Sequence, residues 1–143
     1  MRNTMRVMKR LVDKATIAFI ASIDEDGYPN LKAMLPPRKH HGLKDFWFTT
    51  NTSSLRVKQF QNNQKASLYF YDRHLMYHGL MLIGEMEVLT DSETKESIWK
   101  MGDVMYYHKG VTDPDYAVLK FTAKKGRYYH MFKSESFEVA QDE

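Results

Sequence analysis

Residues 46–72 read FWFTTNTSSLRVKQFQNNQKASLYFYD, and this stretch decides the fold predicted for the chain. Its first four residues are aromatic and β-favouring, which predicts a strand. The small polar run 50–54 suits a turn and a helix N-cap, because such side chains bond nearby backbone N–H groups. Apolar residues at helical spacing, from Leu55 to Phe60, then predict a short helix that Asn62-Asn63 ends, and a second aromatic strand follows over 66–71.

A strand that turns through hydroxyl residues into a helix start can bind an anion. The first-turn N–H groups lack intrahelical partners and carry the positive end of the helix dipole. Thr50, Ser53 and Ser54 add hydroxyl donors, and Arg56 adds a planar cation that suits a phosphate group. An ordinary capped helix with a solvated arginine fits the same residues, so the residues by themselves leave both interpretations open.

The stretch resembles the FMN-binding split-barrel family typified by pyridoxamine 5'-phosphate oxidase. In that family an aromatic strand ends in a Tyr-Thr-Asn-like segment, a Ser-Arg-Lys or Ser-x-Lys segment opens a helix, and an Asn-Pro-x-Ala turn leads to another aromatic strand. The matching residues here are Thr49-Thr50-Asn51, Ser54 with Arg56, Asn63-Gln64-Lys65-Ala66 and Leu68-Tyr69-Phe70-Tyr71. Two residues depart from the pattern: Leu55 stands where the oxidase has an arginine, and Gln64 replaces the proline. The resemblance extends over nearly the whole chain and looks closest to the small general-stress flavin proteins.

The resemblance implies that the strand end and the helix start hold the phosphate of FMN. By position, Lys32 takes the place of a phosphate-binding arginine, with Arg38 as an alternative cation, while Met34 and Leu35 line the flavin ring. The complete set of cofactor-binding residues implied in this way is Lys32, Met34, Leu35, Phe48, Thr49, Thr50, Ser53, Ser54, Arg56, Trp99 and Tyr107.

Assembly is also implied by the resemblance. Related proteins form dimers with FMN at the interface, so we expect a homodimer here. The second subunit is expected to contribute aromatic and basic residues from the segment 99–109 to the flavin site. The candidates are Trp99, Tyr106, Tyr107 and Lys109.

Composition bounds the remaining possibilities. With 143 residues, 43% hydrophobic and 13% aromatic, the chain is long and apolar enough for one domain with a real core. No apolar run approaches the roughly 20 residues of a membrane helix, and the basic N-terminus lacks the apolar segment of a secretory signal. The absence of cysteine excludes disulfides and thiolate chemistry, and cytoplasm is the default compartment. The net charge of +3 is scattered and forms no stripe that would track a nucleic acid.

The other segments predict a mainly β fold, a β-barrel with short helices. Strands are expected where apolar or aromatic runs are bounded by turn residues: 16–23, 28–35, 76–89, 116–122, 127–132 and an edge strand over 134–139. About seven strands and two or three short helices, joined mostly by hairpins, favour a closed or split antiparallel barrel over a parallel sheet. We therefore predict one domain over 1–143, an antiparallel split barrel of the FMN-binding type.

Several local features carry their own predictions. The apolar run 16–23 is expected to be a strand buried on both faces. The basic segment 38–44 reads as an exposed loop, whose adjacent histidines are solvated and bind no metal. A capping box from Thr90 to Glu93 predicts a helix that continues through Met101. The Lys-Lys-Gly segment at 124–126 reads as a hairpin turn.

Two further helix and turn predictions come from the first part of the chain. Asn3 or Thr4 is expected to cap a helix that runs to about Lys14, with apolar residues at helical spacing. The acidic turn 24–27 ends in glycine and predicts a hairpin.

The sequence contains no glycine-rich nucleotide loop, no serine nucleophile elbow and no convincing pair of carboxylates. Catalysis would therefore depend on a bound cofactor, and we expect an FMN-dependent oxidoreductase with an unknown substrate or electron partner. Pyridoxamine phosphate is not the expected substrate, because Tyr128-Tyr129-His130 does not reproduce the Arg-x-His pattern of the oxidase. The alternatives are a haem-binding barrel, with an axial ligand among His74, His78 and His108, and a non-catalytic flavin-binding or dimerisation module.

Overall fold

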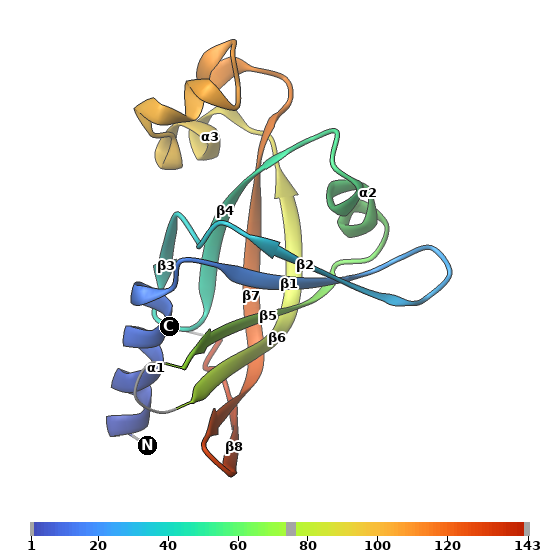
Figure 1. The fold of residues 1–143 in the computed structure, drawn as a ribbon. Coiled ribbons are helices and arrows are strands. Elements are labelled where there is room, and N and C mark those ends of the chain that lie inside the picture. Colours follow the sequence, from blue (N-terminus) through green and yellow to red (C-terminus); the bar gives the residue numbers. More distant parts are fainter. Residues whose placement is uncertain (1, 74–76, 142–143) are drawn as a thin grey trace.

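Eight antiparallel strands curl around an apolar core in the computed structural model of the protein, which describes residues 2–73 and 77–141 (Figure 1). In chain order the elements are α1 (Arg2–Lys14), β1 (Ala18–Ile23), β2 (Pro29–Met34), β3 (Lys39–His41), β4 (Asp45–Asn51), α2 (Leu55–Asn62), β5 (Lys65–Asp72), β6 (His78–Leu89), α3 (Ser92–Ile98), the 3-10 helices η1 (Met101–Met105) and η2 (Gly110–Thr112), β7 (Tyr116–His130) and β8 (Lys133–Glu138).

The sheet is organised around the long strands β6 and β7. Strands follow the order β2-β1-β5-β6-β7-β4-β3, and every pairing is antiparallel. One edge of β7 pairs with β6 along its length, while the other edge pairs first with β4 and then with β8. The path ends at β2 and β3, and the barrel is split between these two strands. The predicted mainly β, antiparallel split barrel is confirmed.

Two apolar clusters stabilise the fold. The larger fills the barrel, where the apolar faces of α1 and α2 pack against inward side chains of the sheet. The helices contribute Met8, Leu11, Val57 and Phe60, and the strands contribute Phe46, Phe48, Leu68, Leu82 and Phe121. The smaller lies between α3, the 3-10 helices and the far end of β7, and its buried members are Ile98, Tyr107, Tyr116 and Val118. Figure 1 shows α3 and the 3-10 helices at one end of β6 and β7, with β8 at the opposite end.

The first hairpin has the predicted shape, but its strands are less buried than expected. The Gly27 N–H donates to the Asp24 carbonyl at 3.0 Å, and Gly27 has φ +86°, a conformation that favours glycine. Strand β1 alternates between buried and half-buried residues, so burial on both faces was wrong. An antiparallel strand with one face on the core and one face open has this alternation.

The segment 124–126 is not a turn. β7 continues through it, because β6 pairs with residues on both sides and holds the backbone extended. The Lys-Lys-Gly composition is accommodated by a bulge: Ile83 pairs with Lys125 and Gly84 with Ala123, which leaves Lys124 as the extra residue. The pair of lysines is exposed, as expected for residues on the outer face. The chain reverses only after His130, and β8 is the predicted edge strand.

Predictions at the helix ends were partly wrong. Helix α1 begins at Arg2, before both predicted N-cap residues, and ends at Lys14 as predicted. Helix α3 is capped by Asp91, whose carboxylate accepts from the Thr94 N–H at 3.0 Å, and not by the capping box predicted one residue earlier. It ends at Ile98, and Met101 belongs to η1. The predicted start of β6 at Met76 lies outside the described residues. Among the described helices, none has both the length and the apolarity to cross a membrane.

Candidate functional site

The end of β4 and the start of α2 form the strand–turn–helix unit that the sequence predicts. β4 ends at Asn51, and α2 begins at Leu55 with Ser54 as its N-cap. The Ser54 Oγ accepts a hydrogen bond from the Val57 N–H at 3.3 Å. A hydroxyl that accepts this bond still has its own proton to donate. The local geometry of a helix-start anion site is therefore present.

Unmet hydrogen-bonding capacity is concentrated in this unit. Within the part of the chain that the structure describes, two buried side-chain polar atoms have no hydrogen-bond partner, Thr50 Oγ1 and Arg56 Nε. Burial disfavours the charged guanidinium and lowers the pKa of Arg56. Buried polar groups in native proteins are nearly always paired, so two such atoms within seven residues make this unit a candidate binding site. Both atoms are donors, and a phosphate group has several acceptor oxygens that could complete donors of this kind.

A carboxylate fixes the turn between the two elements. Asp115 accepts from Asn51 Nδ2 at 2.8 Å, from Thr52 Oγ1 at 2.9 Å and from the Ser53 N–H at 3.0 Å. The hydrogen bonds from Asn51 and Ser53 lower the pKa of Asp115 to about 2, because they stabilise the ionised form. The Ser53 side chain is also hydrogen-bonded to this carboxylate. Ser53 is thus engaged by Asp115, whereas Thr50 and Arg56 have donors to spare.

The residues predicted to reach the flavin from the second strand lie on the edge strand β2 or just after it. Lys32 is exposed and pairs with Ile20 of β1. Met34 packs against the barrel core, whereas Leu35 is 63% exposed. Phe48 is fully inside the barrel core and can meet a ligand only through its backbone.

Trp99 and Tyr107 lie together in the smaller apolar cluster. The Trp99 ring is 5.1 Å from the Tyr116 ring and 6.2 Å from the Tyr107 ring. Burial raises the pKa of Tyr107, and a hydrogen bond with the Thr49 side chain partly opposes that shift. This hydrogen bond joins the aromatic cluster to β4, next to Thr50. The predicted Thr49 and Tyr107 are therefore neighbours, although within one chain both serve packing.

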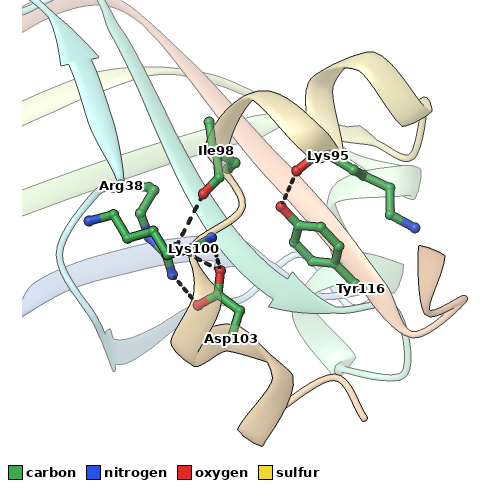
Figure 2. Close-up of polar contacts among 6 residues, drawn as sticks. All are labelled: Arg38, Lys95, Ile98, Lys100, Asp103 and Tyr116. Atoms are coloured by element: carbon green, nitrogen blue, oxygen red, sulfur yellow. Dashed lines mark hydrogen bonds and ion pairs between the residues drawn. The ribbon is translucent and has the colours of Figure 1, made fainter. Parts of the chain in front are cut away.

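An ion pair fastens the same segment to the edge of the barrel (Figure 2). Arg38 donates to both carboxylate oxygens of Asp103, at 2.8 and 2.9 Å, and to the Ile98 carbonyl at 3.2 Å. Asp103 also accepts from the Lys100 N–H at 2.8 Å. Arg38 is engaged in this contact, so it is not an available alternative cation for phosphate.

The prediction that 38–44 is an exposed loop was wrong. Residues 39–41 form β3 against β4, and the Arg38 side chain is 14% exposed. The basic composition suggested a solvated segment, but the cation of Arg38 is neutralised by Asp103, 65 residues away. His40 contacts the Asp13 carboxylate at 2.6 Å, so it is not freely solvated either.

The histidines considered for haem have different surroundings. The two ring nitrogens of His78 lie 3.1 Å from the Tyr128 hydroxyl and 3.7 Å from the Asp72 carboxylate. His108 is exposed between η1 and η2. His74 lies outside the described residues. Of the two histidines that the structure describes, neither His78 nor His108 is directed into a buried apolar site, where a haem axial ligand would be expected.

Two acidic residues of this region were missed in the sequence. Neither Asp115 nor Asp103 is among the site residues predicted from the sequence. The signal that could have singled out Asp115 is its place directly before a strand that pairs with β4, since this pairing brings it beside the end of β4. No local pattern marks Asp103.

Comparison with known proteins relates this architecture to one family. The family model described as pyridoxamine 5'-phosphate oxidase matches residues 5–130. A curated pyridoxine/pyridoxamine 5'-phosphate oxidase from Klebsiella pneumoniae is 32% identical over 98 residues. That match covers 68% of this chain but only 39% of the relative, so the chain spans about two fifths of the length of the oxidase.

Solved structures show the same fold. A Clostridium acetobutylicum protein related to general stress protein 26, of the pyridoxinephosphate oxidase family, is 42% identical, with a TM-score of 0.87 over 96% of this chain and 95% of that chain. A haem-binding protein from Mycobacterium smegmatis is 12% identical, with a TM-score of 0.71 over 90% of this chain and 55% of that chain. At 12% identity the second likeness concerns the fold alone.

Proposed function

The chain belongs to the pyridoxamine 5'-phosphate oxidase family, and we propose that it binds FMN and acts as a flavin-dependent oxidoreductase. The observation that carries the proposal is the pair of unpartnered buried atoms at Thr50 and Arg56. They lie where a strand turns into a helix, and that place favours a phosphate group.

The phosphate would be held by three kinds of donor. Arg56 supplies the cation, Thr50 and Ser54 supply hydroxyls, and the first turn of α2 supplies backbone N–H groups. Lys32, exposed on the edge strand, is a second cation. Leu55, which is 67% exposed, stands where the oxidase has an arginine. The helix start therefore has one arginine fewer, and Arg56 is the arginine that remains there for the phosphate.

The flavin ring would lie against edge strand β2, where Met34 and Leu35 offer apolar contacts. Large apolar side chains on and beside this edge are open to solvent, including Leu31 at 72% and Leu55 at 67%. In the segment that Arg38 joins to this edge, Met105 at the end of η1 is 77% exposed and Tyr106, directly after it, is 66% exposed. Apolar surface of this extent fits an interface, and we propose that a homodimer covers both the edge and the flavin.

Redox chemistry would come from the cofactor, since bound FMN exchanges electrons with a donor and an acceptor. The chain would contribute binding and placement: a cationic site for the phosphate and an apolar edge for the ring. An anionic vitamin substrate would need a second cation cluster. Among the residues that the structure describes in the C-terminal half, Lys124, Lys125 and Arg127 are exposed on β7 and do not supply one. We therefore propose a substrate other than pyridoxamine phosphate.

The absorption spectrum of the freshly purified protein tests the proposal. We expect the two-banded spectrum of a flavin, and after its removal a titration should show that FMN binds more tightly than riboflavin. A sharp Soret band would indicate a haem protein instead. A chain without a chromophore that fails to bind added FMN would leave only the non-catalytic dimerisation module.

A further inference from the structure

Asp115 lies outside the set of residues that would touch the phosphate, but it contacts each of the three residues in the turn before the N-cap. Its carboxylate accepts from the Asn51 side chain, the Thr52 side chain and the Ser53 N–H, at 2.8 to 3.0 Å. The Asp115 carbonyl also accepts from the Thr52 N–H at 2.8 Å. One residue therefore accounts for most of the polar contacts that shape this turn.

The position of Asp115 is itself fixed from behind. Its N–H donates to the Asp113 side chain at 2.9 Å, and Asp113 also accepts from the Lys109 N–H at 3.1 Å. The Lys95 ammonium, on α3, donates to the Asp113 carbonyl at 3.1 Å. Directly after Asp115, Tyr116 begins β7 and donates its hydroxyl proton to the Lys95 carbonyl at 2.7 Å (Figure 2). The carboxylate thus extends from a well-braced corner of the fold.

We propose that Asp115 is a positioning residue of the phosphate site: it holds residues 51–53 so that Thr50, the Ser54 cap and Arg56 face one anion. This inference rests on the proposed FMN binding. It also removes Ser53 from the set of direct phosphate donors, because the N–H and the side chain of Ser53 are directed to Asp115.

A carboxylate suits this role better than an amide would. Two ionised oxygens can accept all three hydrogen bonds, each of them charge-assisted. An asparagine has one oxygen and an NH2 group, so it loses the charge and also requires the Asn51 amide to turn its own oxygen toward that NH2 group. The negative charge has an opposite effect, since it repels a phosphate nearby. If positioning dominates, removing the charge while retaining the shape should weaken FMN binding. If repulsion dominates, the same change should strengthen FMN binding.

Asp115→Asn is the test, and FMN and riboflavin are the two probes, each titrated into the apo-protein by the quenching of flavin fluorescence. We expect FMN to bind about tenfold more weakly, as for the loss of one charge-assisted hydrogen bond, and riboflavin to change by less than about twofold. Glu93→Gln removes the same charge from an exposed position on α3 and should leave both affinities unchanged.

A second variant covers the case in which Asp115→Asn does not fold. Asn51→Ala removes one of the three donors and leaves the carboxylate, so FMN should bind about two- to threefold more weakly, with riboflavin again unaffected. Thermal unfolding of each apo-protein establishes that it is folded before titration.

The outcomes separate the two proposals. An unchanged ratio of FMN to riboflavin affinity in Asp115→Asn, or tighter FMN binding, would overturn the positioning role while FMN binding by the parent protein stands. Equal loss of both ligands would show a general structural role and also overturn it. A parent protein with no affinity for FMN would overturn the proposed function and this inference together.

Discussion

Replacement of Arg56 by methionine should separate ligand binding from stability. Methionine keeps an unbranched stem of similar length, so the packing of α2 against the barrel is retained, while the guanidinium is lost. In the protein without ligand, Arg56 Nε is buried without a partner, and burial lowers the pKa of the group. Removing an unsatisfied buried donor relieves a desolvation cost, so we expect the apo-protein to be as stable as the parent or slightly more stable.

The effect on FMN should have the opposite sign. A hydrogen bond to a charged group contributes about 1.5–3 kcal/mol, which corresponds to about 10- to 150-fold in affinity. Arg56→Met should weaken FMN by a factor in this range. Riboflavin has no phosphate, so its affinity should be nearly the same in the parent and the variant.

Titration of the apo-proteins, with denaturant unfolding measured in parallel, checks both signs. Lys58→Met is the matched control, because Lys58 is exposed on the same helix and its loss changes the net charge equally. The control should keep most of the FMN affinity. If Arg56→Met binds FMN as tightly as the parent, or loses riboflavin to the same extent, then the phosphate is not held by Arg56 and the reasoning from unpartnered atoms fails.

Three further predictions concern the fold and its assembly. Asp103→Asn should lower the free energy of unfolding by about 3 kcal/mol at neutral pH, because it leaves the buried Arg38 cation without its counter-charge. Burial raises the pKa of Asp103, but the hydrogen bonds from Arg38 and Lys100 outweigh this effect and lower the pKa. The stabilisation by this carboxylate should therefore be complete above about pH 4 and be lost as the pH falls through the lowered pKa. Parallel pH profiles of stability for the parent and the variant would contradict this. Gly84→Ala should cost at least about 2 kcal/mol in denaturant unfolding, since its Cβ would lie 2.0 Å from the Thr122 carbonyl oxygen, whereas Gly102→Ala meets no atom within 4 Å and should be neutral. Light scattering at micromolar concentration should give the mass of a dimer, and a flavin-loaded monomer would exclude a site shared between subunits.

The parts of the fold that the sequence predicts well are those determined by near neighbours. The Ser54 cap, the short helix after it and the aromatic strands on either side depend on residues within about four positions of one another, and all are present. The hairpin at Gly27 is of the same kind. Where a pattern of nearby residues competes with strand pairing, the pairing decides. The Lys-Lys-Gly segment has a turn composition, but β6 pairs along β7 on both sides of it, and a bulge replaces the turn.

Contacts between residues far apart in sequence were not predicted, because no local pattern encodes them. Arg38 and Asp103 are separated by 65 positions, and the sequence predicts an exposed loop at Arg38 and no partner for it. Their bidentate pair neutralises a cation that the predicted loop would leave in solvent, and the strand after it forms by pairing with β4. The same applies to Asp115, which reaches a turn more than 60 positions earlier.

The candidate site shows why residue types alone could not settle its ligand set. Thr50, Ser53, Ser54 and Arg56 are all donors, and the sequence gives no reason to rank them. The fold ranks them by what each already contacts: Ser53 is occupied by Asp115, Ser54 accepts a bond but keeps its proton, and Thr50 and Arg56 have buried atoms with no partner. A buried donor without a partner lowers the stability of the protein unless a ligand accepts its hydrogen bond. We therefore expect Thr50 and Arg56, whose unpaired donors destabilise the ligand-free protein most, to bind the phosphate.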